Sequence, residues 1–442
     1  MIRRLSILIA ALFAFSFFQA KPVAAQQQLI VRTLDLPLLQ NACLLNSCKI
    51  VQTLDGTVGQ LVLVDVPSIL PIQTLESILK LVPGVLDVEV NSLLNIGGKV
   101  PLGTIPNGLN ERTPVNYFGN MVWTGYANQP ASLMIQLPQA QSQFKTAGTV
   151  IVADIDTGVD FTHPALKGVL LQGYDFTRNQ AGGNEMNDVS CQTCSNAGLD
   201  QSTAAVLDQS TAAVLDQSTA AVLDSPQYSD FGHGTMVMGV IHMVAPTAQL
   251  MPLKAFSASG GGQLSNILAA IYYAVQNHAN VINMSFDFGT SYSSDLAQAI
   301  AYAEKNGVVC VASAGNDSES ATVYPAGLAG VMGVGSVSDT DERSSFSNFG
   351  AADVYVAGPG ENVISTYPYD TYASESGTSF TSPMVAGAAA LMIQMNSNTT
   401  SAEVTAAIAK TSALPASDNL GHGLLNIHSA LAYMQAVLGA QK

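Results

Sequence analysis

Beyond residue 149 the chain alternates between short, nearly continuous apolar runs and longer stretches in which apolar residues recur with helical spacing. Near-continuous apolar runs are typical of buried parallel strands, and helical spacing is typical of the helices that cover such a sheet. We therefore expect an α/β fold with a mostly parallel central sheet between helices. The expected strands are residues 150–155, 249–253, 281–284, 308–312 and 331–337, and the expected helices are residues 264–276, 295–306, 383–395 and 401–411.

A different pattern occupies the N-terminal part of the chain. Apolar runs at 29–34 and 59–66 surround an amphipathic stretch at 75–81. This pattern predicts a small α+β unit over residues 28–95. Residues 96–128 are rich in Gly, Asn and Pro without clear periodicity, which is typical of a linker, and we expect the maturation site within them. Residues 129–442 then form the larger domain.

Residues 1–25 have the pattern of a secretory signal peptide. Arg3 and Arg4 precede an apolar stretch at 5–18, and Ala24-Ala25 offers small residues for cleavage. A membrane anchor is the alternative, but an anchor needs about 20 apolar residues. We therefore expect export with cleavage near Ala25, and no membrane contact after the leader is removed.

The charge balance bears on possible partners. The chain has 16 Lys and Arg against 32 Asp and Glu, a net charge of −16. A nucleic-acid partner requires a basic face, so this balance argues against one.

An octad that begins at Leu199 is repeated without change at Leu207 and Leu215. On a helix, eight residues at about 100° each rotate consecutive copies by roughly 80°, so no constant apolar stripe forms. Three short copies are also too few to build the core of a repeat protein. We expect an acidic, mobile surface insertion within residues 180–228 that forms helix only transiently.

Three polar residues carry candidate chemistry. Asp156 lies in an Asp-Thr-Gly segment after an apolar run, His233 opens a His-Gly-Thr segment before a helical stretch, and Ser379 ends a Gly-Thr-Ser segment. A serine hydroxyl is a poor nucleophile until a histidine accepts its proton and a carboxylate orients that histidine. Aspartic peptidases also use Asp-Thr-Gly, but they need two such aspartates, and no second Asp-Thr/Ser-Gly segment occurs here.

The sequence around these residues resembles the subtilisin family of serine peptidases. The similarity is strongest from Ser376 to Gly387, which reads SGTSFTSPMVAG, and it continues through DFGHGTMVMG around His233. It covers residues 129–442 and, more weakly, the N-terminal unit, which resembles a subtilisin propeptide; an ordinary accessory domain is the alternative. The resemblance implies a three-layer fold, Asp156, His233 and Ser379 as the catalytic triad, and a propeptide that templates folding and then blocks the cleft.

The same resemblance implies further site residues. Asn316 would donate its side-chain amide to the developing oxyanion, together with the N–H of Ser379 at the start of a helix; a turn-forming asparagine is the alternative role. An extended substrate would pair with the backbone of two segments. The substrate-binding residues implied are Gly260, Gly261, Gly262, Ser285, Phe286, Asp287, Ala314 and Gly315.

Two acidic residues depart from the family pattern. Asp287 stands where a glycine is usual, so it could favour basic side chains or simply face solvent. Asp154 stands two residues before Asp156, where an apolar residue is usual, and shares its strand face. If both carboxyl groups are buried, the pKa of one should be raised.

The sequence offers little for metal binding. Many subtilisins hold calcium with an acidic residue after a His-Pro pair and with a loop inserted in the histidine helix. Here Ala165 takes the first position, and the sequence leaves no room for the loop. We expect no required cofactor and no tight metal site, and a weak calcium site near Tyr324 and Asp353 is the one candidate.

Four of the five cysteines form local pairs, Cys43 with Cys48 and Cys191 with Cys194. Export permits disulfides, which we expect for both pairs, with free thiols as the alternative. A zinc site at 191–194 would lack its second ligand pair. Cys310 lies in an apolar run and is expected to be a small buried hydrophobe.

These features predict a secreted serine endopeptidase that is made as a zymogen and acts as a monomer on protein or peptide substrates, with its own propeptide as an intramolecular inhibitor. The alternative is a binding or structural protein built on an inactive subtilisin scaffold.

Overall fold

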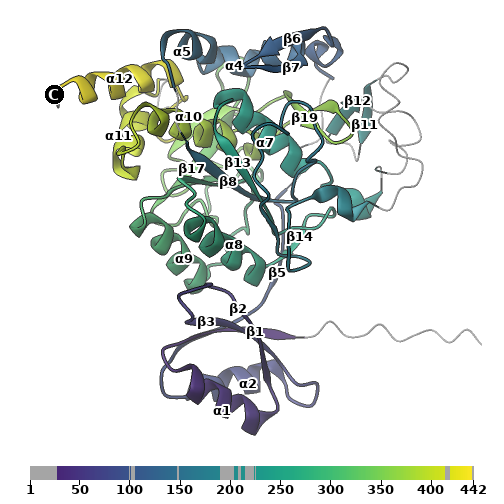
Figure 1. The fold of residues 1–442 in the computed structure, drawn as a ribbon, viewed down its shortest axis with the longest axis vertical. Helices are drawn as coiled ribbons and strands as arrows, with labels where there is room; N and C mark the ends of the chain where they lie inside the picture. Colours follow the sequence, from purple (N-terminus) through teal and green to yellow (C-terminus); the bar gives the residue numbers. More distant parts are fainter. Residues whose placement is uncertain are drawn as a thin grey trace, which may run out of the picture.

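A computed structural model describes residues 27–98, 100, 105–146, 149–189, 204–207, 211–214, 223, 225–413 and 419–440. The expected signal peptide and the pair Cys191 and Cys194 lie outside these residues, as do parts of the octads. Figure 1 shows a small N-terminal unit below a larger domain, with the strand β5 between them.

The larger domain is built around an eight-stranded sheet in the order β10-β9-β13-β8-β15-β16-β17-β18. Neighbouring strands from β9 to β18 run parallel, and β10 pairs antiparallel with β9. All five expected strands belong to this sheet, so the prediction of a mostly parallel α/β fold is confirmed. The strands are β8 Ile151–Asp156, β9 Tyr174–Asp175, β10 Gln180–Ala181, β13 Gln249–Lys254, β15 Val281–Met284, β16 Val309–Ser313, β17 Val331–Val337 and β18 Val356–Pro359.

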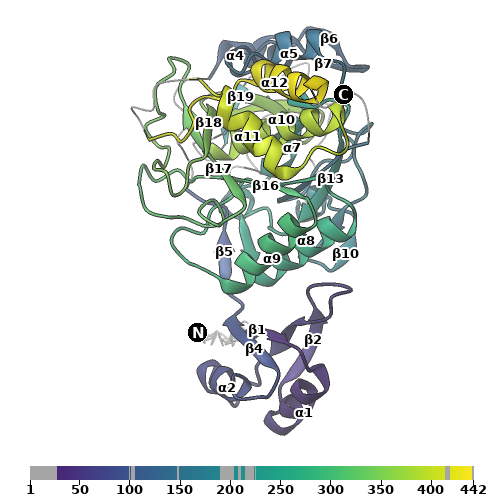
Figure 2. The same cartoon turned by 90° about the vertical axis from the view of Figure 1, so that its left-hand side faces the viewer.

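Helices cover both faces of this sheet (Figures 1 and 2). One face packs against α7 and α10, and the other packs against α8 and α9. Along β8, Val152 belongs to the core on the α7 and α10 side, whereas Ala153 and Ile155 belong to the core on the α8 and α9 side. Since side chains alternate along a strand, Asp154 and Asp156 share the face of Val152 and point toward α7 and α10.

The predicted helices agree with the structure to within one residue. Those at 264–276 and 401–411 have the same bounds, and the other two begin one residue earlier. The start of α9 is set by Ser293, whose hydroxyl accepts a hydrogen bond from Leu296 N, as is usual for a helix N-cap. The helices are α7 His233–Val244, α8 Leu264–Gln276, α9 Ser294–Lys305, α10 Ser382–Met395, α11 Ser401–Thr411 and α12 Ile427–Ala440.

The expected linker contains regular structure. Residues 107–127 form a 3-10 turn, a hairpin and a short helix. Phe118 and Gly119 both have positive φ and form the two-residue turn of the hairpin. Two more short helices lead into β8. These elements are η1 Asn107–Asn110, β6 Pro114–Tyr117, β7 Asn120–Trp123, α3 Thr124–Ala127, α4 Pro130–Met134 and α5 Leu137–Gln143.

The small N-terminal unit is an antiparallel sheet in the order β2-β3-β1-β4 with two helices. It has a separate apolar core that includes Leu29, Leu39 and Leu75. The sequence pattern did not indicate its first helix. The elements are β1 Gln28–Thr33, α1 Leu36–Asn46, β2 Lys49–Thr53, β3 Leu61–Asp65, α2 Ile72–Leu79 and β4 Val85–Val90.

Two of the cysteines expected to pair are free thiols. Cys43 and Cys48 are both buried and unbonded in the core of the small unit, so the predicted disulfide is wrong for this pair. A hydrogen bond between the thiols raises the pKa of Cys43 and lowers that of Cys48. Cys310 is buried in β16, where burial raises its pKa to about 12.

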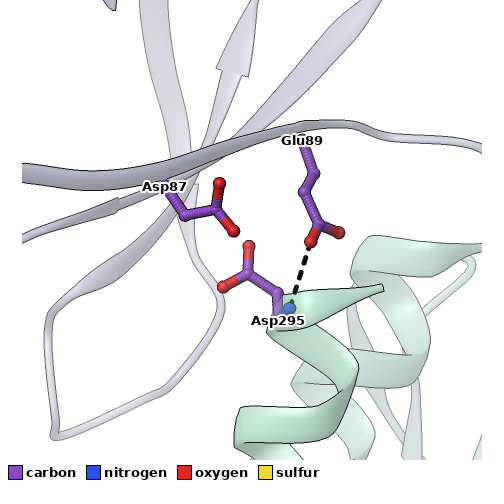
Figure 3. Close-up of side chains that lie close together, drawn as sticks. All are labelled: Asp87, Glu89 and Asp295. Atoms are coloured by element: carbon purple, nitrogen blue, oxygen red, sulfur yellow. Dashed lines mark hydrogen bonds between the residues drawn. The ribbon is translucent and has the colours of Figure 1, made fainter. Parts of the chain in front are cut away.

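The small unit contacts the larger domain at the start of α9, where Asp87 and Glu89 from β4 meet Asp295 (Figure 3). Glu89 Oε1 accepts hydrogen bonds from the backbone N–H groups of Ser294, at 2.7 Å, and Asp295, at 3.2 Å. A carboxylate at a helix N-terminus satisfies free N–H groups and the helix dipole. Arg32 Nε lies 2.7 Å from Asp295 Oδ1 and offsets part of the negative charge.

The octads differ from the prediction. Ala204–Leu207 and Thr211–Val214 form the antiparallel strands β11 and β12, so the expectation of transient helix is wrong for these residues. Strand β12 pairs with β20 (Thr371–Glu375), which in turn pairs with β19 (Val363–Tyr367). The exposed edge of β20 supplies backbone partners that an isolated segment lacks, and this tertiary pairing decides the conformation.

The contact at α9 should depend on pH. Burial raises the pKa of Asp295 to about 6 against the effect of Arg32, and Glu89 and Asp87 add to the rise. Because this pKa lies above its unfolded value, the folded protein binds the extra proton, so the free energy of unfolding should fall as pH rises from about 4 to about 6, by roughly 3 kcal/mol. Denaturant unfolding of the uncut Ser379→Ala chain with and without Asp295→Asn checks this. Parallel curves for the two proteins would contradict it.

Candidate active site

The first site residue, Asp156, ends the central strand β8. Its side chain is buried, and its Oδ1 accepts a hydrogen bond from Thr157 N at 2.6 Å. Gly158 then turns the chain with φ of +99°. Parallel strands present such residues at their carboxyl ends, where open α/β sheets form their sites.

His233 is the first residue of α7, and its ring faces Asp156. His233 Nδ1 lies 2.8 and 2.9 Å from the two oxygens of Asp156. This contact assigns the proton to Nδ1 and leaves Nε2 to accept a proton from another group. The preceding Gly232 has φ of +90°, and a Cβ there would overlap the ring of Tyr367, so the turn into α7 requires glycine.

Burial and charge act in opposite directions on His233. Burial of the ring lowers its pKa, but the Asp156 carboxylate outweighs this effect and the pKa rises to about 9. The imidazolium formed when His233 takes up a proton is therefore stabilised at this position.

A buried carboxyl that the sequence did not reveal, Glu185, lies behind this pair. It accepts hydrogen bonds from Gly232 N, at 2.8 Å, and from the hydroxyls of Thr157 and Thr235. Burial raises its pKa to about 8. Glu185 therefore joins the end of β8 to the start of α7. Its stretch of sequence carries no family motif that could have identified it.

Lys254, also missed from sequence, supports the same region from β13. Its ammonium group is buried and donates to Thr157 O at 2.8 Å, to Phe256 O at 2.7 Å and to Asp188 Oδ2 at 2.7 Å. A buried ammonium with three acceptors fixes the backbone after Asp156.

Ser379 lies in the 3-10 helix η5 (Thr378–Phe380), and α10 begins only at Ser382. The expectation that a helix begins at Ser379 is therefore wrong by three residues, because a tighter 3-10 turn comes first. Ser379 Oγ donates to Ser285 O at 3.1 Å. The hydroxyl proton of Ser379 is thus bound to the carbonyl oxygen of Ser285.

A buried polar network fixes the backbone of Ser379. Ser285 Oγ donates to Ser379 O at 2.9 Å, and Asn283 Nδ2 donates both to Ser285 Oγ and to Asp154 Oδ1. As expected for two buried carboxyls on one strand face, burial and then Asp156 raise the pKa of Asp154 well above its ordinary value. Asp154 thus belongs to the support of the nucleophile.

The side chain of Asn316 has a fixed orientation. Its Oδ1 accepts from Thr378 N and Thr378 Oγ1, both at 2.9 Å. Its Nδ2 is thereby directed into the cleft, where it donates to Gly98 O at 2.7 Å. An amide held in this way can stabilise negative charge on a carbonyl oxygen.

The chain that follows the small unit lies along the glycine segment that is expected to bind substrate. Strand β5 (Leu93–Asn95) pairs antiparallel with β14 (Gly261–Gln263), and Ile96 N donates to Gly260 O at 2.9 Å. Gly260, Gly261 and Gly262 thus hold this chain by backbone pairing. Beyond β5, Gly97 and Gly98 join His233 and Ser379 around a cavity of about 20 Å³.

The other expected substrate-binding residues differ from one another in burial and in their contacts. Asp287 is 7% exposed and faces Gly97. Phe286 is buried and its ring packs against Phe256 and Phe288. The backbone of Ala314 pairs with Val334 and Asn348, and Gly315 N donates to Thr378 Oγ1 at 3.2 Å.

The residues available for metal binding do not reproduce the calcium site of the family. Ala165 offers no side-chain oxygen, and α7 continues from His233 to Val244 without an inserted loop. Near Tyr324, Asp353 Oδ1 accepts from Val323 N at 3.0 Å. A weak site there stays a prediction. In the part of the chain that the structure describes, one group of three carboxylates is close enough for an ion, namely Asp87, Glu89 and Asp295, which the α9 contact explains.

Comparison with known proteins agrees with this geometry. Residues 147–428 match the model of the Subtilase family, Peptidase S8. The chain belongs to the subtilase family. It is 32% identical over 336 residues to the thermophilic serine proteinase of Bacillus sp. (strain AK1), with 74% of each chain covered. It is 41% identical over 209 residues to subtilisin Savinase of Lederbergia lenta, which covers 45% of this chain and 77% of Savinase.

A solved structure shows the same fold. Fervidolysin from Fervidobacterium pennivorans, a keratinolytic enzyme related to subtilisin, aligns with a TM-score of 0.69 at 22% identity. The alignment covers 92% of this subtilase and 61% of fervidolysin, so our chain spans less than two thirds of that protein. The predicted fold and enzyme class, a subtilisin-like serine peptidase, are confirmed.

The pKa of His233 predicts the pH dependence of this subtilase. We expect His233 to act as a general base, which must be unprotonated, so kcat/KM should rise with pH by about tenfold per pH unit until it levels off near pH 9. In Asp156→Asn the rise should occur at lower pH, because the carboxylate that raises the pKa is gone. Peptide hydrolysis measured between about pH 6 and 10 tests this. A rate that is flat over this range would contradict it.

Asn316→Ala should lower kcat by about 10²–10³-fold with little change in KM, a magnitude taken from loss of the same kind of donor in a subtilisin. The reason is that the amide acts mainly on charge that develops in the transition state. Steady-state kinetics separate the two constants. A large rise in KM with unchanged kcat would show that Asn316 serves substrate binding instead.

Proposed function

We propose that this subtilase is an exported serine endopeptidase that uses Asp156, His233 and Ser379 as its triad and is made as a zymogen. One observation carries the proposal. Ser379, His233 and Asn316 line a single small cavity. His233 is hydrogen-bonded to the Asp156 carboxylate, and the Asn316 amide donates a hydrogen bond to the peptide carbonyl of Gly98. This combination supports acyl transfer to water.

In the first half of the reaction, Ser379 Oγ attacks the carbonyl carbon of the scissile peptide bond, and His233 Nε2 takes the hydroxyl proton. Asp156 holds the ring and stabilises the imidazolium. The Asn316 amide stabilises the negative charge on the former carbonyl oxygen. His233 then returns the proton to the leaving amine, the C–N bond breaks, and an acyl-enzyme forms.

In the second half, water replaces the amine. His233 accepts a proton from the water as its oxygen attacks the acyl carbon, and the same proton returns to Ser379 Oγ when the ester bond breaks. The enzyme recovers its starting protonation state. The product is a peptide that ends in a free carboxyl group.

Residues 28–95 are proposed to act as the propeptide and intramolecular inhibitor. The support is the pairing of β5 with β14 and the contact of Gly98 with Asn316, because a segment in this position excludes other peptides. Export rests on the pattern of residues 1–25. None of the helices in the described part of the chain has the length and apolarity needed to cross a membrane.

The competing proposal is an inactive scaffold. The observation in its favour is the hydrogen bond from Ser379 Oγ to Ser285 O, because a hydroxyl proton donated to Ser285 is not donated to His233. A serine hydroxyl can, however, change its acceptor when the site tightens around a substrate, so this hydrogen bond does not exclude catalysis.

Fluorophosphonate labelling of the full chain tests the proposed function. The wild type should label and should be recovered without its N-terminal unit, whereas Ser379→Ala should neither label nor lose that unit. Ser338→Ala, a serine outside the cleft, is the matched control and should behave as the wild type. An unlabelled wild type, or identical processing of wild type and Ser379→Ala, would contradict the proposal.

A further inference from the structure

The candidate site contains an unusual pairing of two glycines with two carboxylates. Gly97 faces Asp287, and Gly98 faces Asp317. The glycines belong to the segment that follows β5, and the carboxylates belong to the larger domain. This pairing bears on which peptides the proposed peptidase can cut.

The hydrogen bonds of the segment fix its register on the site. The carbonyl of Gly98 receives the Asn316 amide, so Gly98 occupies the place of the residue that would be acylated, and Gly97 precedes it. The carbonyl that Ser379 would attack is therefore that of Gly98. Backbone pairing upstream, at β5 and Ile96, holds the segment extended as a substrate would be.

The space beside Gly97 is closed by Asp287. A Cβ added to Gly97 would stand 2.8 Å from Asp287 Cγ and closer still to Oδ2, a separation that real Cβ atoms essentially never show. Asp287 is held in this position by the backbone of its own loop, because its Oδ1 accepts a hydrogen bond from Gly289 N at 3.1 Å.

The space beside Gly98 is less restricted. A Cβ there would stand 3.2 Å from Asp317 Oδ1, which is tight but tolerable if the carboxylate shifts slightly. Asp317 is also exposed to solvent, so its side chain has room to turn. Asp287 therefore imposes the stricter requirement.

Steric exclusion at Asp287 also argues against a preference for basic side chains, one of the two roles that the sequence left open. A lysine or arginine would gain an ion pair with this carboxylate, but each carries a Cβ that meets the same obstruction. Glycine is the one residue type without a Cβ. The position facing Asp287 thus excludes basic residues together with all others.

We propose that Asp287 makes this subtilase selective for glycine at the residue that precedes the acylated one, so that its substrates are protein segments with glycine at that position, its own Gly97-Gly98 among them. The inference rests on the proposed function and adds the substrate class to it. Self-processing by the same rule yields a mature chain that begins at Lys99.

Hydrolysis of quenched fluorescent peptides by the self-processed enzyme tests the selectivity. The reference peptide has the sequence of residues 93–100, and matched peptides carry Gly97→Ala, Gly97→Lys or Gly98→Ala. We expect kcat/KM to fall about 100-fold for both changes at Gly97 and by much less for Gly98→Ala, as for a pocket that cannot admit an added carbon. N-terminal sequencing of the processed enzyme should give Lys99.

Two enzyme variants separate size from charge. Asp287→Gly should reduce the preference for glycine over alanine at this position to about one. Asp287→Asn should keep the preference, because the amide has the same size. A wild-type enzyme that cuts the alanine peptide as well as the glycine peptide would overturn the inference, as would a preference for lysine that Asp287→Asn abolishes.

Failure of the inference and failure of the proposed function have different signatures. An enzyme that labels with fluorophosphonate and cuts all the peptides equally retains the proposed function and loses the selectivity. A chain that neither labels nor cuts any peptide loses both.

Discussion

The hydrogen bond between His233 Nδ1 and Asp156 joins the end of a central strand to the first residue of α7. Several buried contacts of the larger domain keep this strand end and this helix start in place. Both side chains are buried, so the pair is shielded from water and Asp156 acts on the ring at close range. Glu185 ties the turn before α7 to Thr157, and Lys254 fixes the backbone after Asp156. Small movements of strand or helix would therefore change the orientation of the base.

Ser379, the proposed nucleophile, is held by a separate set of hydrogen bonds. Ser379 lies in a 3-10 turn whose backbone carbonyl is bonded to Ser285, and Ser285 is bonded through Asn283 to Asp154 on the same strand as Asp156. Asp156 and the hydrogen bonds that hold Ser379 are thus both attached to one strand, β8, although 223 positions separate the two residues in the sequence. A mostly parallel sheet makes this possible because it brings the carboxyl ends of distant strands to one edge.

Much of this was predictable from sequence, and the exceptions have physical reasons. The parallel strands and their helices follow from apolar periodicity, and the expected triad, Asp156, His233 and Ser379, follows from local motifs. Glu185 and Lys254 could not be identified, since their roles depend on tertiary neighbours and not on nearby sequence. Cys43 and Cys48 lie close enough to suggest a disulfide, yet they are buried thiols. The octads lack the constant apolar stripe of an amphipathic helix, but the sequence does not indicate that they form strands. That depends on the pairing of β12 with β20, which only the structure shows.

The pairing of β12 with β20 has a consequence for how the repeat can change. Each octad contains the same Thr-Ala-Ala-Val stretch that forms β12, and eight is an even number of residues. Gain or loss of one copy therefore preserves the side of the sheet that each side chain faces. It also leaves an identical strand available to pair with β20, which ends at Glu375, four residues before Ser379. The repeat can thus vary in copy number over evolution without altering the register of the strand next to the nucleophile.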